Sequence, residues 1–242
     1  MLRNCYKLIL PVIFFLSIST PVTAYGWPFF FSTQEQAKPI DTPVVTHKLV
    51  LDPAGDAHTT GREIGDVFER SLTLQCCQAL KEQIETSLPS CRVFLTRMAG
   101  ETIEPLQTIS FSNQVGATLH VSLHFFEHTK QKPELFIYTF SYDPATDFIE
   151  KKSTDLALIP YDQAYKLSLK KTREFSTLFF NACMSSPDKH LAHCHEPIAV
   201  PFKPLRGISA PAFGIEIGIS RKDQVPLLIP LILYALKLVI QS

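Results

Sequence analysis

The sequence predicts an α/β domain, a three-layer sandwich in which helices flank a mixed, mainly parallel sheet of about six strands. Two observations predict it. From residue 48 onward, short apolar runs alternate with longer stretches whose apolar residues have helical spacing, which is typical of a sheet covered on both faces. Apolar residues also make up 45% of the 242-residue chain, enough for one sizeable core. In such folds ligands bind where polar loops leave the carboxyl ends of the strands.

The first strand and helix lie on either side of a polar loop. Leu49-Val50-Leu51 is an apolar run that breaks at Asp52-Pro53. Residues 66–88 then carry apolar side chains at helical spacing with a polar opposite face, and Pro89 ends the pattern. We therefore expect a strand, a loop of small and polar residues, and an amphipathic helix with Glu69 in its first turn.

The middle of the chain continues the alternation. Residues 92–96 (RVFLT) read as a second strand, and residues 106–115 as a short helix that Gly116 ends. Residues 118–123 form an apolar run that ends on His124. This run is the predicted third strand.

The second half adds three strands and two helices around an insertion rich in turn residues and charges. Glu216 is a single carboxylate inside the last apolar strand, and Asp162 is a plausible N-cap of the long helix. The last helix is very apolar, but Tyr234 and Lys237 interrupt a run already short for a bilayer, so we expect it to pack on the core. The expected strands are 134–140, 198–201 and 213–219, the helices are 162–182 and 225–240, and the insertion is 141–161.

The N-terminus has the form of a targeting segment. Arg3 and Lys7 supply positive charge, residues 8–18 supply a short apolar run, and Val22-Thr23-Ala24 is a small-residue cleavage site. We predict a signal peptide over 1–24, a linker or N-terminal arm over 25–47, and one folded domain over 48–242. The protein is then expected to be exported, to the periplasm or cell envelope, without a stable membrane span after cleavage.

Charge and cysteine content narrow the function classes. The formal net charge is zero, which gives no electrostatic basis for binding nucleic acid or an anionic membrane, and we expect neither. Five cysteines remain after the predicted cleavage, so at least one thiol is unpaired. Cys183 with Cys194 is the favoured disulfide, Cys76 or Cys77 with Cys91 is a second possibility, and the alternative is that several are buried thiols.

Several short motifs occur in the order and spacing of a known family. Together they make the chain resemble the zinc-dependent N-acetylmuramoyl-L-alanine amidases of the type-3 family, over residues 48 to about 241, with a divergent region between 141 and 195. The motifs are Asp52-Pro53-Ala54-Gly55-Asp56-Ala57, Glu69-Arg70-Ser71-Leu72, Leu95-Thr96-Arg97, Ser112-Asn113, Ser122-Leu123-His124-Phe125-Phe126, Leu205-Arg206 and Ile215-Glu216-Ile217-Gly218-Ile219.

The resemblance implies a zinc site. Catalytic zinc takes three protein ligands and keeps a fourth position for a water whose pKa it lowers. By resemblance, Glu69 and His124 are ligands, Glu216 is the general base, and Asn113 and Arg206 bind substrate. The alternative readings are a first-turn helix charge for Glu69, a hydrogen-bonded strand-end histidine for His124, and a structural ion pair, for example with Arg206, for Glu216.

The chain departs from the family at the first ligand. Gly55 stands where the family has a histidine, and glycine has no side chain to bind metal. Three outcomes stay open: His58 on the same loop replaces it, Asp56 replaces it, or there is no third ligand. Thr108 also stands near the place of a family arginine, and Phe126 in the place of an asparagine, so the substrate cleft is expected to differ.

A second group of metal-binding side chains lies in one loop. His190, His193, Cys194 and His195 fall within six residues, but their spacing lacks the paired arrangement of a structural zinc site. We therefore favour a solvated loop. The function expected from the sequence is an exported zinc-dependent amidase that hydrolyses the bond between N-acetylmuramic acid and L-alanine in peptidoglycan; the alternative is an inactive amidase-like domain that binds cell wall or a partner protein.

Overall fold

The computed structural model describes residues 44–104, 106–142 and 160–242. The predicted signal peptide, nearly all of the predicted arm and most of the predicted insertion lie outside these residues.

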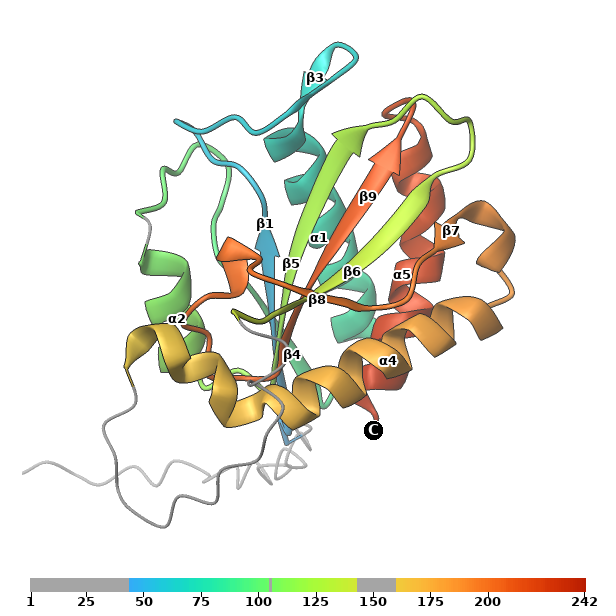
Figure 1. Ribbon diagram of the computed structural model, residues 1–242. Coiled ribbons are helices and arrows are strands. Elements are labelled where there is room, and N and C mark those ends of the chain that lie inside the picture. The colour runs from blue at the N-terminus through green and yellow to red at the C-terminus, as the bar shows by residue number, and fades with distance from the viewer. Residues whose placement is uncertain (1–43, 105, 143–159) are drawn as a thin grey trace, which may run out of the picture. The chain divides into compact units, whose positions relative to one another are not determined.

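The described part alternates strands and helices as expected (Figure 1). Its strands and helices are β1 (His47–Pro53), β2 (Glu63–Ile64), β3 (Val67–Phe68), α1 (Glu69–Ser87), β4 (Cys91–Leu95), α2 (Gln107–Val115), β5 (Leu119–Glu127), β6 (Glu134–Phe140), the 3₁₀ helix η1 (Tyr161–Ser168), α4 (Leu169–Ser185), η2 (Lys189–Leu191), β7 (His193–Cys194), β8 (Ile198–Val200), η3 (Lys203–Leu205), β9 (Ala212–Ile219) and α5 (Gln224–Ile240).

Seven strands form one mixed sheet in the order β4-β1-β5-β9-β6-β7, with β8 also paired to β6. The pairs β4–β1, β1–β5 and β5–β9 are parallel, and β6 runs antiparallel to β9. The predicted three-layer α/β fold is therefore confirmed. The last strand of the chain, β9, lies in the middle of the sheet, between β5 and β6.

The two faces of the central strands differ in chemistry. One face carries aliphatic side chains together with Phe125 and Phe213, and α1 and α5 cover it, behind the sheet in Figure 1. This burial explains why α5 is so apolar: it is a packing helix, with Leu231, Ile232, Ala235 and Leu236 fully buried. Within the described residues, no helix has both the length and the apolar character needed to cross a membrane.

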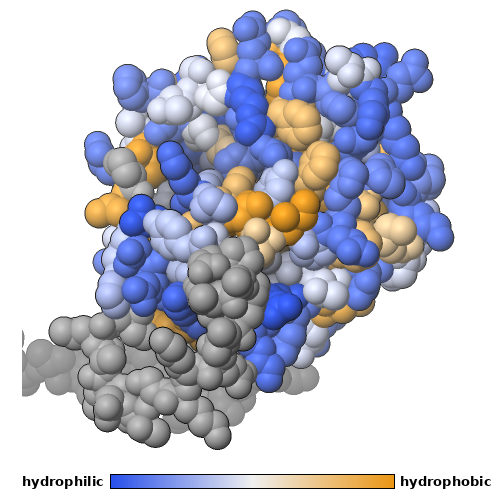
Figure 2. Space-filling model, viewed as in Figure 1, coloured by the Kyte–Doolittle hydropathy of each residue, from blue (hydrophilic) through white to orange (hydrophobic). Residues whose placement is uncertain are grey.

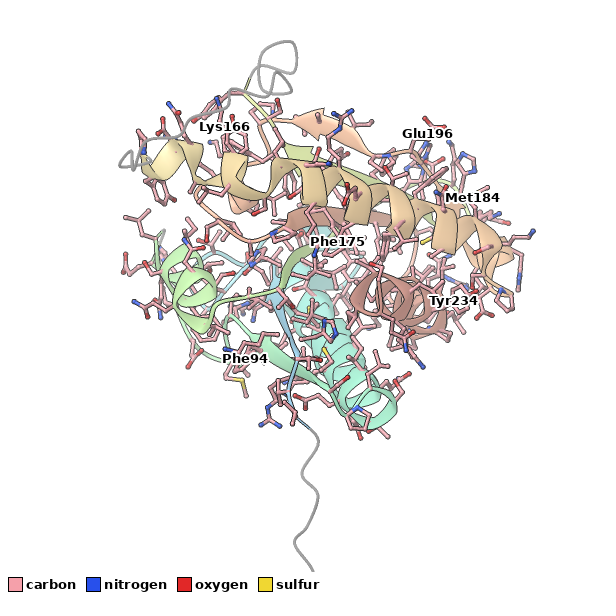
Figure 3. All side chains as sticks on the ribbon, turned by 90° about the horizontal axis from the view of Figure 1, so that it is seen from below. Phe94, Lys166, Phe175, Met184, Glu196 and Tyr234 are labelled. Carbon is pink, nitrogen blue, oxygen red and sulfur yellow. The ribbon has the colours of Figure 1, made fainter. Side chains whose placement is uncertain are left out.

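The other face is only partly covered. Its lower half in Figure 1 holds a second apolar cluster, which includes Ile109 of α2, Phe140 of β6, Leu169 of α4 and Ala212 of β9. Seen from below, α4 lies beside α5, and Phe175 of α4 points toward the core against which it packs (Figure 3). The upper half of this face, at the carboxyl ends of β1, β5 and β9, is the place where the candidate site lies.

The structure differs from the sequence prediction at three element boundaries, and strand pairing explains two of the differences. The helix expected from residue 66 begins at Glu69, because residues 63–68 pair as the β2–β3 hairpin. The helix expected from 162 opens as the 3₁₀ helix η1 and becomes α-helical only at Leu169. β5 runs on to Glu127, because β9 pairs with it along its whole second half.

The cysteines of the described residues are free thiols. All five are buried, and no disulfide joins Cys183 to Cys194 or Cys91 to the Cys76-Cys77 pair. Cys183 and Cys194 are nevertheless neighbours that share a side-chain hydrogen bond. The sequence left open disulfides or buried thiols, and the structure has buried thiols.

Candidate active site

The loop after β1 is held in place by residues of the family-like motifs. The Asp52 carboxylate accepts hydrogen bonds from the hydroxyls of Thr96 (2.6 Å) and Ser122 (2.9 Å). The buried Arg97 guanidinium donates to the backbone carbonyls of Pro53 (3.0 Å) and Ala54 (3.0 Å). These bonds tie the carboxyl ends of β1, β4 and β5 together, so these motif residues build the scaffold of the site.

Glu69 is the first residue of α1, and backbone N–H groups of β5 and of the loop before β2 hold its carboxylate. Oε1 accepts a hydrogen bond from the Phe125 backbone N–H (3.1 Å) and Oε2 from the Arg62 backbone N–H (3.0 Å). Burial opposes ionisation of this carboxyl, but the hydrogen bonds from His124 and from the two backbone N–H groups outweigh it and hold its pKa below the ordinary value. Glu69 is therefore an anion fixed in position.

His124 lies in β5 between two partners. Its Nδ1 is 3.3 Å from Glu69 Oε1, and its Nε2 is 3.0 Å from Ser122 Oγ. The same residue is the register partner of Glu216 in the β5–β9 pairing. The structure therefore brings together Glu69, His124 and Glu216, the three residues that the sequence singled out.

Two residues that the sequence analysis did not single out hold Glu216. Arg62 Nη1 lies 2.6 Å from Glu216 Oε1, and the Tyr138 hydroxyl donates to the same carboxylate. Burial, the negative charge of Glu216 and this hydrogen bond together raise the pKa of Tyr138 to about 12. The partner of Glu216 is thus Arg62, from the loop before β2, and not Arg206.

The loop that replaces the family histidine has a structure of its own. Gly55 has a φ of +74°, and a Cβ on it would lie 2.9 Å from Arg70 Cβ. The Asp56 carboxylate accepts backbone hydrogen bonds from His58 (2.8 Å), Thr59 (2.5 Å) and Ile103 (2.9 Å), which lower its pKa despite burial. Both Asp56 oxygens are therefore used to shape the loop, whereas the His58 side chain is exposed.

A catalytic zinc ion requires three protein ligands close to one point. Glu69 Oε1 and His124 Nδ1 are separated by 3.3 Å, close enough for two ligands of one ion. Gly55 offers no donor, and both Asp56 oxygens are engaged. Among the described residues, no group of three or more His, Cys, Asp or Glu side chains is arranged to hold a metal ion. The residues as placed therefore do not fit a three-ligand zinc site.

The two predicted substrate-binding residues contact other parts of the fold. Asn113 donates to the Gly207 carbonyl (3.0 Å) and accepts from Ser209, which ties α2 to the loop before β9. The Arg206 guanidinium lies over the Tyr142 ring at 5.6 Å. Neither contact involves Glu69, His124 or Glu216.

The side chains of the histidine-rich loop at 190–195 contact different parts of the fold. His190 Nδ1 faces the Pro187 carbonyl (3.3 Å), and Cys194 faces Cys183. His195 stacks on Phe136, with ring centroids 4.2 Å apart, and its Nε2 lies 3.9 Å from Glu134. Among the described residues, these four side chains form no group that could hold a metal ion.

Three solved structures with a fold similar to that of this chain are N-acetylmuramoyl-L-alanine amidases. The catalytic domain of CwlV, an N-acetylmuramoyl-L-alanine amidase from Bacillus (Paenibacillus) polymyxa var. colistinus, is 16% identical, with a TM-score of 0.56 over 79% of this chain and 96% of that one. The amidase AmiC2 of Nostoc punctiforme is 16% identical, with a TM-score of 0.53 over 81% and 98%. Ami1 of Mycobacterium smegmatis is 10% identical, with a TM-score of 0.56 over 83% and 99%.

This chain has the fold of the N-acetylmuramoyl-L-alanine amidases. The predicted resemblance is confirmed at that level, and the solved structures that share the fold are hydrolases of this kind. A curated sequence agrees: the amidase CwlM of Bacillus licheniformis is 29% identical over 77 residues, 32% of this chain. The matched segment spans 30% of that relative's length. No protein-family model matches the chain.

Proposed function

We propose that this chain is an amidase of peptidoglycan, which hydrolyses the amide bond between N-acetylmuramic acid and L-alanine. The observation that carries the proposal is the meeting of Glu69, His124 and Glu216 at the carboxyl ends of the central strands, in a chain with the amidase fold. The predicted export fits a substrate that lies outside the cytoplasm.

Glu216 is the proposed general base. Its carboxylate is only 14% exposed, and it is oriented from two sides, by Arg62 at 2.6 Å and by the Tyr138 hydroxyl. A carboxylate held in this way takes a proton from an attacking water and later returns it to the leaving amine.

Zinc dependence is the second part of the proposal, and it needs a third ligand in addition to Glu69 and His124. As placed, no described side chain joins these two to form a three-ligand group. Glu69 and His124 would hold the ion, and His58 is the proposed third ligand, which would reach them only if its loop moved. It is exposed and lies on the loop between Gly55 and Gly61, two glycines with positive φ. Asp56 is the weaker candidate, because three backbone N–H groups occupy its oxygens.

The test uses purified mature protein, residue 25 onward, and isolated peptidoglycan sacculi. Release of soluble stem peptides with a free L-alanine amino group is expected from the natural sequence. The Glu216→Gln variant should lose that release, whereas Glu82→Gln, at an exposed position of α1, should retain it. Equal release by the natural protein and by Glu216→Gln would refute the assignment of the base.

A non-catalytic function is the alternative that specific observations favour. Gly55 removes one ligand, and the Arg62 guanidinium occupies one oxygen of Glu216. A domain of this kind would bind cell wall or a partner protein without cutting it. Sedimentation of the protein with sacculi, without release of stem peptides at any zinc concentration, would select this alternative.

A further inference from the structure

The backbone of Arg62 is fixed to the first residue of α1. Its N–H donates to Glu69 Oε2 (3.0 Å), and its carbonyl accepts a hydrogen bond from the Glu69 N–H (2.8 Å). Gly61, just before it, has a φ of +75°, and a Cβ there would lie 2.7 Å from Glu69 Oε2. These are backbone contacts, so the path of the chain at Arg62 does not depend on the Arg62 side chain.

The β2–β3 hairpin that follows Arg62, at the top of Figure 1, is anchored as well. Ile64 is only 1% exposed and belongs to the main core, and Val67 packs against the same core. Lys222, after β9, lies 2.7 Å from the Asp66 carboxylate. The backbone is therefore held both at Arg62 and beyond it.

The Arg62 side chain reaches from this fixed backbone to Glu216. Its guanidinium lies over the Phe126 ring, 5.7 Å from the ring centroid, and Nη1 lies 2.6 Å from Glu216 Oε1. The side chain is nevertheless 49% exposed. Because arginine has a long stem with several rotatable bonds, the guanidinium can turn away from Glu216 into solvent while the backbone stays in place.

The surroundings of Glu216 strengthen its attraction to Arg62. The Glu216 side chain is largely buried, and its register partner on β6 is Phe136. In Figure 2 apolar side chains gather at the centre of this face, with hydrophilic ones around them. Water therefore screens the Glu216 charge less than it screens a carboxylate on an open surface, and the ion pair is stronger than a fully exposed one.

The Arg62 contact orients Glu216, but it also opposes the use of Glu216 as a base. A general base becomes neutral when it accepts a proton from the attacking water. A protonated Glu216 would leave the Arg62 guanidinium without the negative charge that it faces. The ion pair therefore stabilises the resting protein more than the state after proton transfer, and an interaction of that kind slows the chemical step.

Tyr138 holds Glu216 in a different way. Burial and the negative charge of Glu216 raise the pKa of Tyr138 to about 12, so its hydroxyl stays protonated at neutral pH and donates to the carboxylate. A neutral donor loses no ion pair when Glu216 takes up a proton. Tyr138 can therefore keep Glu216 oriented after the Arg62 guanidinium has left.

We propose that Arg62 is a self-inhibitory latch: its guanidinium holds Glu216 in the resting protein and must turn away into solvent before Glu216 acts as the base. The inference rests on the proposed function, in which Glu216 is that base. It goes further by assigning the described arrangement to the resting state. It predicts that removal of the Arg62 charge makes the protein faster, whereas the loss of a residue needed to orient the base would make it slower.

The first measurement is the initial rate of stem-peptide release from sacculi by the mature protein at saturating substrate. Arg62→Gln should raise this rate at least about threefold, the effect of losing one partly exposed ion pair. Arg62→Lys, which keeps a positive charge, should raise it less. Arg92→Gln is the matched control and should leave the rate unchanged, because Arg92 pairs with Glu85 at 3.5 Å on β4, two strands away from β9. An equal or lower rate for Arg62→Gln would overturn the inference.

A second measurement detects the latch without the reaction. A water-soluble carbodiimide couples glycine ethyl ester to accessible carboxyl groups, and peptide mapping by mass spectrometry gives the extent of coupling at each position. Arg62→Gln should increase coupling at Glu216 and leave coupling at Glu134, which pairs with Lys130, unchanged. Equal coupling at Glu216 in the natural protein and in Arg62→Gln would also overturn the inference.

The two measurements separate this inference from the proposed function. Thermal unfolding of each variant shows that it is folded, and Arg62→Gln keeps both backbone hydrogen bonds to Glu69. Release by every variant, with no gain in Arg62→Gln, contradicts the latch alone. No release by any variant, with increased coupling at Glu216 in Arg62→Gln, contradicts the amidase alone.

Discussion

Replacing Gly55 should be costly, because the backbone there excludes a side chain. Its φ of +74° is a conformation that costs an L-residue about 1–2 kcal/mol. A Cβ would also lie 2.9 Å from Arg70 Cβ and 3.1 Å from the Thr59 carbonyl oxygen. Crowding of this kind costs about 1–3 kcal/mol. We therefore expect Gly55→Ala to lower the free energy of unfolding by about 2–5 kcal/mol.

Gly100 is a matched control. Its φ is +83°, but a Cβ there would have no neighbour within 4 Å. Gly100→Ala therefore carries the backbone cost without the crowding, and both variants gain equally from a less flexible unfolded chain. Urea unfolding should find Gly55→Ala less stable than Gly100→Ala by about 1–3 kcal/mol. Equal costs in the two variants would refute the reasoning.

A histidine at position 55 would meet the same backbone strain and crowding as an alanine. Gly55→His should be destabilised at least as much as Gly55→Ala, and it should bind no more zinc than the natural protein, because the loop has no room for the side chain at this position. Elemental analysis of the purified variant measures this. One zinc per chain at unchanged stability would contradict the account of the loop.

Three further predictions follow from the same contacts. Asp56→Ala should cost about 2–4 kcal/mol in urea unfolding, because three backbone N–H groups lose their acceptor, whereas His58→Ala should cost less than about 0.5 kcal/mol. The pKa of Glu69 lies below its ordinary 4.5, so the stability it contributes is present above that value and is lost as the pH falls through the folded-state pKa; Glu69→Gln should flatten this acid limb of a pH–stability curve. Burial raises the pKa of Cys76 to about 12 and of Cys91 to about 11, so a thiol reagent at pH 8 should label these two cysteines only after unfolding, and fewer than five labelled thiols in the unfolded mature protein would reveal a disulfide.

Most helices and strands could be predicted from the local sequence pattern. The predicted and observed boundaries differ where contacts between distant parts of the chain determine the structure. The β6 range matched at both ends because turn residues bound its apolar run. The start of α1 did not, because residues 66–68 contain no glycine or proline, and Val67-Phe68 pair with Glu63-Ile64 as a hairpin only in the folded chain. The position of β9 between β5 and β6 was likewise not readable, since strand order depends on how all the strands pack.

Some residues of the candidate site could likewise be predicted from the sequence, and others could not. Glu69, His124 and Glu216 carried motif signals, and the structure brings them together. Arg62 carried none, because it reaches the site from a loop whose path is set by packing, and Tyr138 carried none, because its contact with Glu216 depends on the pairing of β6 with β9. Asp56 was a plausible ligand by residue type, but an aspartate in a loop also caps backbone N–H groups, and that role decides its geometry here.

The most direct test of the account is the reaction with a defined muramoyl peptide, in which N-acetylmuramic acid is linked to L-alanine through its lactyl group. Mass spectrometry of the products identifies the bond that is cut. The account predicts free peptide with an L-alanine amino terminus and an intact sugar acid, formed by the natural protein and not by Glu216→Gln. An uncut substrate at saturating zinc, or cleavage at any other bond, would contradict it.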